Sequence, residues 1–215
     1  MKIKALMLLA AFSLSGLAMT AQEQALPTPE QKAGLTIMES FAQRKSVRDF
    51  SDKELSKQEL SNLLWAAKGQ NRTDGKLTAP SCLNFQEIRL FVFDKNGVAE
   101  YLPATHSLKS VATGDYRNLV AGGQEFASKA PICLVMVADM TKFNERLGGI
   151  NERTKMMAAV DAGIVSENIS LACAGLGLAT VPRASMEADK IISLLNLSNS
   201  HIAIMNNPVG FEAKQ

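Results

Sequence analysis

The chain has 215 residues, and its 23 lysines and arginines nearly balance its 21 aspartates and glutamates, which leaves a formal net charge of +2. This balance, without a basic run, gives no support for a nucleic-acid partner. The 3 cysteines are widely spaced and form no C-x-x-C pair, so we expect no metal site and no dithiol redox chemistry. A disulfide in an oxidising compartment stays open.

Residues 1–21 have the pattern of a secretory signal peptide. Lys2 and Lys4 precede a mostly apolar run, and Ala18-Met19-Thr20-Ala21 supplies small residues at its exit. The run is short for a membrane span, although an uncleaved anchor is an alternative. We therefore expect an exported, soluble protein, in a bacterial periplasm, with no membrane contact after cleavage. Cleavage would remove two lysines and no acid, so the remaining chain would carry no net charge.

The rest of the chain is predicted to be one domain, residues 34–215, behind a flexible Gln- and Pro-rich lead-in at residues 22–33. Apolar residues at helical spacing predict a helix at about residues 34–43. Ser56 and Glu59 form a capping box that opens a second helix, which ends near Gly69. Turn-forming residues then predict a loop over residues 70–82.

The middle of the chain contains the first predicted strands. Residues 88–93 and 98–102 flank Asn96-Gly97, a favoured hairpin turn. We expect residues 103–116 to be irregular and a helix at residues 117–128. The near-continuous apolar run of residues 132–138 is typical of a central strand.

The longest predicted helix covers about residues 153–175. Small residues recur in it every four positions and form a stripe that allows close helix packing: Ala158, Ala162, Ser166, Ser170 and Ala174. Asp161 and Glu167 argue against a membrane span here. A short extended segment at residues 179–181, a helix capped by Ser185 and a strand at residues 201–205 follow. This irregular alternation favours an α+β fold with a mixed sheet.

Two motifs carry most of the chemical information. Arg44-Lys45-Ser46-Val47-Arg48 is predicted to be extended, so Arg44, Ser46 and Arg48 share one face. Two guanidinium groups and a hydroxyl on one face suit phosphate oxygens, although such a motif alone is also consistent with a solvated charged edge. The second motif, Pro80-Ser81-Cys82-Leu83-Asn84-Phe85-Gln86, favours the ligand interpretation.

Other catalytic machinery is not visible in the sequence. There is no G-x-S-x-G, H-E-x-x-H or P-loop motif. His201 is interpreted as structural, and the role of His106 stays open. Without a nucleophile–base pair, hydrolysis has little support, and a cofactor that carries the chemistry itself fits better.

The two motifs, in this order and at this separation, resemble those of the nitroreductase family of flavin enzymes. Further segments continue the resemblance: Leu63–Ala67, Ala130-Pro131, Ala174–Pro182 and Pro208–Gly210. The resemblance covers about residues 36–211. It implies a mainly antiparallel sheet flanked by helices and a homodimer, with the small-residue helix as the dimer helix.

The resemblance also implies FMN, bound at the dimer interface. It assigns the FMN phosphate to Arg44 and Ser46, the flavin pyrimidine edge to Arg48, and the flavin N5 side to the backbone of Pro182 and Arg183. Ser81 and Asn84 would contact the flavin from the partner subunit. Lys45, Pro80 and Lys214 complete the predicted cofactor-binding set. No catalytic side chain is implied, because the chemistry takes place at flavin N5.

Two departures from the family pattern matter. Ala184 and Ser185 stand where many members have a carboxylate and a glycine. The chain also ends soon after Gly210, which is similar to compact members such as the azoline-oxidising branch.

The sequence is therefore consistent with two functions. The first is an FMN-dependent oxidoreductase that moves two electrons from a reductant to a nitroaromatic, quinone or similar small acceptor. NADH and NADPH are expected to reduce it in vitro with little discrimination, since only isolated cations such as Lys76, Arg117 and Arg183 could bind a 2′-phosphate. The second is an exported flavin-binding module that has the fold but no turnover.

Overall fold

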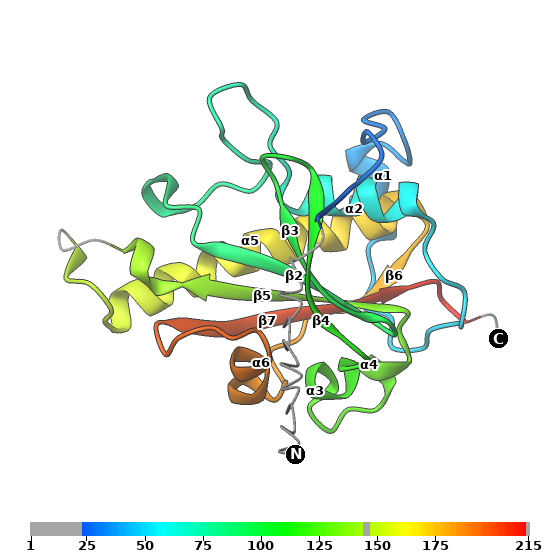
Figure 1. The fold of residues 1–215 in the computed structure, drawn as a ribbon. Coiled ribbons are helices and arrows are strands. Elements are labelled where there is room, and N and C mark those ends of the chain that lie inside the picture. Colours follow the sequence, from blue (N-terminus) through cyan, green and yellow to red (C-terminus); the bar gives the residue numbers. More distant parts are fainter. Residues whose placement is uncertain (1–22, 144–146, 214–215) are drawn as a thin grey trace, which may run out of the picture.

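A seven-stranded sheet runs through the centre of the computed structural model, which describes residues 23–143 and 147–213 (Figure 1). The predicted leader and Lys214 lie outside the described residues. The strand order is β1-β4-β3-β2-β5-β7-β6. The strands are β1 (Glu23–Ala25), β2 (Ile88–Asp94), β3 (Gly97–Leu102), β4 (Ser107–Thr113), β5 (Ile132–Asp139), β6 (Ala179–Thr180) and β7 (His201–Gly210). Every pairing between these strands is antiparallel, so the prediction of a mixed sheet is wrong in that detail.

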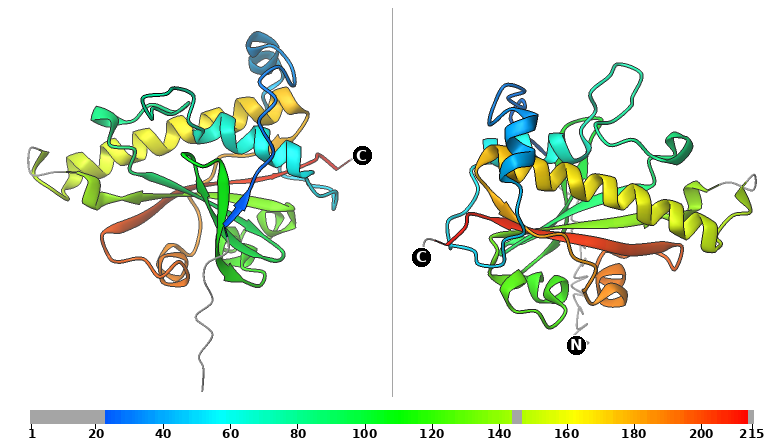
Figure 2. Two further views of the ribbon diagram at one scale, coloured as in Figure 1. Left: turned by 45° about the horizontal axis from the view of Figure 1, so that its top comes forward. Right: turned by 180° about the vertical axis from the view of Figure 1, so that it is seen from behind.

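Helices cover both faces of the sheet and make a three-layer α+β fold (Figures 1 and 2). On one face lie α1 (Ile37–Gln43), α2 (Lys57–Lys68) and α5 (Glu152–Leu176). On the other lie α3 (Arg117–Ala121), α4 (Phe126–Lys129) and α6 (Ala188–Leu194). The fold predicted from the sequence, helices flanking a mainly antiparallel sheet, is thus confirmed.

The central strand β5 contributes side chains to both halves of the core because successive side chains point to opposite faces of the sheet. Leu134 and Met136 pack toward α2 and α5, whereas Cys133 and Val135 pack toward α3 and α6. All four side chains are fully buried. Because both faces of β5 are buried, nearly all of its residues are apolar.

The N-terminal lead-in contains a strand that the sequence did not predict. Its residues Glu23–Ala25 form β1, which pairs with β4. The Leu26 N–H donates to the His106 carbonyl at 3.1 Å, and the Ser61 hydroxyl donates to the Pro27 carbonyl at 2.5 Å. Strand pairing uses backbone groups, which a Gln- and Pro-rich composition does not reveal.

Three other boundaries differ from the prediction. Residues 107–113, expected to be irregular, form β4 and pair with β3. The helix expected at residues 117–128 is split into α3 and α4 because Gly122 and Gly123 have φ angles of 54° and 82°. The helix expected to begin at Ser185 begins instead at Ala188, with Glu187 at its N-cap.

The small-residue stripe of α5 faces its own sheet and not a partner. Ala158 and Ala162 are fully buried, and the Ser166 hydroxyl donates to Asn207 Oδ1 of β7 at 2.7 Å. The expectation that this stripe forms the dimer contact is therefore wrong. The exposed side of α5 carries Met156 and Val160 instead, at 63% and 58% exposure. By length and composition α5 could cross a membrane, but it packs against α1, α2 and β7.

Candidate functional site

The Arg44–Arg48 segment leaves α1 and runs beside β6. The Val47 N–H donates to the Thr180 carbonyl at 2.9 Å, and the Val47 side chain is buried. Arg44, Ser46 and Arg48 are exposed, while Lys45 forms an ion pair with Glu212 at 2.7 Å. The alternation expected from the sequence is therefore present, and the three predicted phosphate- and flavin-binding side chains are presented to solvent.

The same contact brings two predicted parts of the site together. Thr180 is the last residue of β6, and Val181-Pro182 follow it directly. The motif around Ser46 and the segment around Pro182, which are far apart in sequence, thus lie side by side in one protomer. The arrangement forms an exposed basic row next to a short length of extended backbone.

Arg183 does not belong to this surface. Its guanidinium is buried and donates to the Val120 and Ala121 carbonyls at 3.1 and 2.6 Å and to Asn206 Oδ1 at 2.8 Å. Its backbone N–H and carbonyl are both bonded to Asn206, so neither group faces a ligand. The prediction that Arg183 binds cofactor is therefore not supported; it anchors the segment that Pro182 begins.

The Pro80–Gln86 turn has an unusual backbone. Leu83, Asn84 and Gln86 have φ angles of 48°, 58° and 51°, a region that non-glycine residues adopt only when other contacts hold them there. The Gln86 N–H donates to Ser81 Oγ at 2.8 Å, so this predicted flavin ligand also closes the turn. The turn leaves Asn84 exposed.

The turn and the basic row are far apart in one protomer. The Cys82 N–H donates to Asp161 Oδ2 at 2.7 Å, which fixes the turn beside the first half of α5. The basic row lies beside β6, which follows the end of α5 at Leu176 (Figure 1). Fifteen helical residues at about 1.5 Å each separate Asp161 from Leu176, or roughly 22 Å. One protomer therefore does not bring the two motifs together.

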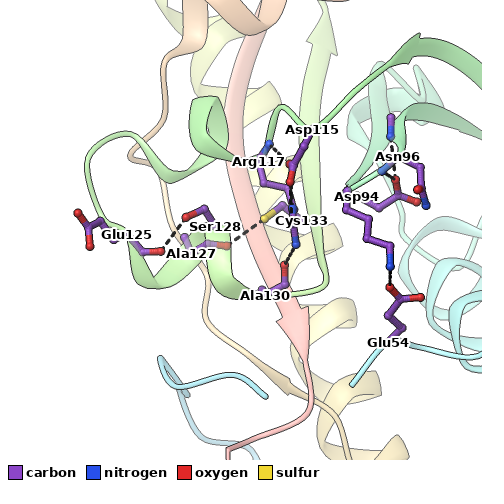
Figure 3. Close-up of polar contacts among 12 residues, drawn as sticks. Glu54, Asp94, Asn96, Asp115, Arg117, Glu125, Ala127, Ser128, Ala130 and Cys133 are labelled. Carbon is purple, nitrogen blue, oxygen red and sulfur yellow. Dashed lines mark hydrogen bonds and ion pairs between the residues drawn. The ribbon is translucent and has the colours of Figure 1, made fainter. Parts of the chain in front are cut away.

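Two other isolated cations have partners of their own. The Arg117 guanidinium donates to both carboxylate oxygens of Asp115, at 2.9 and 2.6 Å, and to the Ala130 carbonyl at 2.9 Å (Figure 3). These bonds lower the pKa of Asp115. Lys76 forms an ion pair with Asp74 at 2.7 Å. Neither cation is free to be a dedicated 2′-phosphate ligand without losing its carboxylate partner.

The histidines and cysteines have structural environments. His106 lies within 2.9 Å of the Tyr101 hydroxyl and 2.8 Å of Ser61 Oγ, so it ties the N-terminal segment to α2 and β3. Burial lowers the pKa of His106 and raises that of Cys133 to about 12. Cys82, Cys133 and Cys173 are all free thiols. Over residues 23–143 and 147–213, no group of three or more His, Cys, Asp or Glu side chains is placed to hold a metal ion.

Sequence reasoning missed a buried charged cluster beside the turn. Glu87 and Asp161 are buried next to each other, and Lys68 lies close to Glu87 with 8% exposure. Burial and the neighbouring Asp161 raise the pKa of Glu87 to about 7, and burial lowers the pKa of Lys68 to about 8. The one feature of the sequence that could have indicated this cluster is Glu87, a single carboxylate directly before an apolar strand.

Comparison with known proteins identifies the family of the chain. The sequence profile of the Nitroreductase family matches residues 41–211. The chain belongs to the nitroreductase family. A proposed nitroreductase of Methanocaldococcus jannaschii is 27% identical over 82% of this chain and 91% of its own length. The FMN reductase [NAD(P)H] of Bacillus subtilis is 24% identical over 75% of this chain and 59% of its own length.

Among solved structures, a proposed nitroreductase from Ralstonia eutropha superposes with a TM-score of 0.81 and 30% identity. The match covers 99% of this chain and 98% of that one. The similarity therefore extends over the whole fold, including both motifs and α5.

Proposed function

We propose that this protein is an FMN-dependent oxidoreductase that moves two electrons from a reductant to a small acceptor such as a nitroaromatic or a quinone. The observation that carries the proposal is the exposed row of Arg44, Ser46 and Arg48 beside the backbone of Thr180–Pro182. Membership of the nitroreductase family and the similarity to an FMN reductase support a flavin-dependent oxidoreductase.

The residues present fit FMN. Arg44 and Ser46 supply charged and neutral hydrogen-bond donors for a phosphate group, and Arg48 supplies a cation for the flavin pyrimidine edge. FMN, when bound, supplies the two-electron chemistry. The protein's part is then to bind and orient the cofactor: the basic row would hold it, and the backbone of Val181 and Pro182 would border the flavin edge.

We further propose a homodimer in which each site takes residues from both subunits. The separation of roughly 22 Å along α5 supports a site in which Ser81 and Asn84 of one chain lie against the basic row of the other. Large apolar side chains exposed on α1, on α5 and near their ends offer the contact surface: Leu35, Ile37, Met38, Phe41, Ile150, Met156 and Val160. Large apolar side chains exposed on neighbouring turns of a helix, such as Ile37, Met38 and Phe41, favour a protein interface.

The electron donor is proposed to be NADH or NADPH in vitro, with little discrimination between them. The name of the related FMN reductase, which includes NAD(P)H, supports a nicotinamide donor. The ion pairs of Lys76 with Asp74 and of Arg117 with Asp115 support the lack of discrimination, because neither cation is free to bind the 2′-phosphate of NADPH. The leader-like residues 1–21 support export, where a partner protein or a small reduced metabolite would replace nicotinamide as the physiological donor.

The alternative is an exported flavin-binding module without turnover, favoured by Ala184 in place of the family's carboxylate. Anaerobic stopped-flow spectroscopy separates the two. A reductase loses its visible flavin absorbance rapidly on adding NADH or NADPH and regains it with a quinone. A flavin-loaded protein whose flavin neither nucleotide reduces faster than free FMN would contradict the enzymatic proposal.

A further inference from the structure

A buried carboxyl pair lies directly beneath the Pro80–Gln86 turn. Glu87 is fully buried, and neither of its carboxyl oxygens has a hydrogen-bond donor among the described residues. The group beside it is the carboxyl of Asp161 on α5, which is 5% exposed. Two adjacent buried carboxylates repel each other strongly, so one shared proton is the stable arrangement.

The two carboxyls differ in their hydrogen-bond contacts. Asp161 Oδ2 accepts the Cys82 N–H at 2.7 Å, so Asp161 has a hydrogen-bond donor of its own. Glu87 has no comparable donor, which favours its neutral form. The raised pKa of Glu87, about 7, agrees with this assignment.

The charged groups around Glu87 and Asp161 do not fully neutralise the pair when both carboxyls are ionised. Lys68 at the end of α2 faces Glu87, but it also faces Glu100 of β3. Lys142 lies near Lys68 and repels it, and Arg153 of α5 lies near Cys82. The ammonium group of Lys68 thus interacts with the carboxyl groups of both Glu87 and Glu100. It cannot also neutralise the charge of Asp161 when Glu87 ionises.

The turn is tied to α5 through one carboxyl of this pair. Leu83 and Gln86 hold positive φ angles, which side chains other than Asn rarely adopt without support from other contacts. The bond from Cys82 to Asp161 ties the turn to α5, and Gln86 donates to Asn84 Oδ1 at 3.2 Å within it. Moving Asp161 would therefore release the segment that presents Asn84.

We propose that Glu87 and Asp161 are positioning residues, which by sharing one proton hold the Pro80–Gln86 turn in the shape that lets Asn84 reach the flavin bound to the partner subunit. The inference rests on the proposed FMN site. When Glu87 loses its proton, repulsion separates the carboxyls and shifts the carboxylate that holds Cys82. FMN affinity should then fall as the pH rises through the pKa of Glu87.

The test is an FMN titration of the full chain, followed by flavin fluorescence, at about pH 6 and about pH 9, on either side of the Glu87 titration. Glu87→Gln donates an amide N–H to Asp161 at every pH. We expect the FMN Kd of the wild type to rise about five- to tenfold more across this range than that of Glu87→Gln. FMN's own titrations affect both proteins equally and cancel in the ratio.

Two further variants complete the design. Asp161→Ala removes the acceptor of Cys82 and should weaken FMN binding at both pH values. Asp74→Asn, which changes an exposed carboxylate in the neighbouring loop, should keep the wild-type pH profile. If Glu87→Gln fails to fold, Asp161→Asn replaces it, since its amide can accept from Cys82 and donate to Glu87.

The outcomes separate this inference from the proposed function. A wild type that binds no FMN at either pH counts against the FMN site itself. A wild type that binds FMN but shows the same pH profile as Glu87→Gln, or an Asp161→Ala variant with wild-type affinity, overturns the positioning role alone.

Discussion

Two arginines of the same chemical type have opposite environments in this fold. Arg44 is exposed on the basic row, whereas Arg183 is buried among the carbonyls of Val120 and Ala121 and the amide of Asn206. The first is available to a ligand, and the second satisfies buried acceptors. Residue type and proximity in the sequence motif do not distinguish them; burial does.

Replacing Arg44 with Ala should therefore weaken FMN binding by about 1.5–3 kcal/mol, the range for losing one charge-assisted contact, with unchanged stability of the apoprotein. Arg183→Ala is the matched control and should behave in the opposite way. It leaves buried acceptors unpaired and should lower the free energy of unfolding by about 2–4 kcal/mol. Isothermal titration and chemical denaturation measure the two quantities. Equal FMN affinity of wild type and Arg44→Ala would contradict the site.

Stability should depend on pH through the buried cluster. Glu87 has a pKa raised from 4.5 to about 7, so the native state binds a proton that the unfolded state has lost in this range. The stability it contributes is fully present below about pH 4.5 and is lost as the pH rises through about 7. The Glu87→Gln variant should lack this decline, which is up to about 3 kcal/mol. Denaturation across pH checks the difference between the two proteins.

Lys68 acts in the opposite direction and at higher pH. Its pKa is lowered from 10.5 to about 8, so the unfolded state binds a proton that the native state lacks between these values. Stability should rise with pH across that window, and Lys68→Met should remove the rise. A slope that both variants share with the wild type would show that other groups set the pH dependence.

At the level of elements, α5 has two faces with different roles. Its inner face carries Ala158, Ala162 and Ser166 and packs on the sheet, whereas Val160 points outward. The stripe of small residues allows α5 to approach its own sheet closely. The outward face, together with α1, is left to form the proposed dimer contact.

The two faces predict two different mutational effects. Val160→Lys places a charge in the proposed contact and should raise the dimer dissociation constant by at least about tenfold, with the protomer still folded. Ala162→Leu should overpack the core and lower the free energy of unfolding by about 1–3 kcal/mol. Analytical ultracentrifugation and denaturation give the two readouts. Dissociation caused by Ala162→Leu at unchanged stability would reverse this assignment.

Sequence patterns predicted the elements that have strong local signals. The capping box of Ser56 and Glu59 is present at the start of α2, and β5 lies where the apolar run indicated. The β1 and β4 strands were missed because their order comes from pairing with other strands and not from their own composition. The face of α5 was misassigned because a stripe of small residues does not show which neighbour it packs against.

The candidate site was likewise predictable only where the signal was local. The motif containing Arg44, Ser46 and Arg48 predicted its own exposed face, because alternation in an extended segment is a local property. The burial of Arg183 and the pairing of Glu87 with Asp161 depend on contacts between distant elements. Such contacts leave no periodic pattern in one sequence.

At the level of the whole molecule, the fold separates the two motifs along the length of α5. The basic row and the Pro80–Gln86 turn each lie on an ordered framework, yet one chain cannot bring them into one site. We therefore propose one site shared between two subunits, with Arg44 from one subunit and Asn84 from the other.

A mixed dimer of Arg44→Ala and Asn84→Ala subunits, purified with two different tags, tests this claim most directly. In the mixed dimer one site carries both changes and the other carries neither. We predict that it binds one FMN per dimer with wild-type affinity, while each parent dimer binds weakly at both of its sites. A mixed dimer that binds no better than its parents would contradict the shared site.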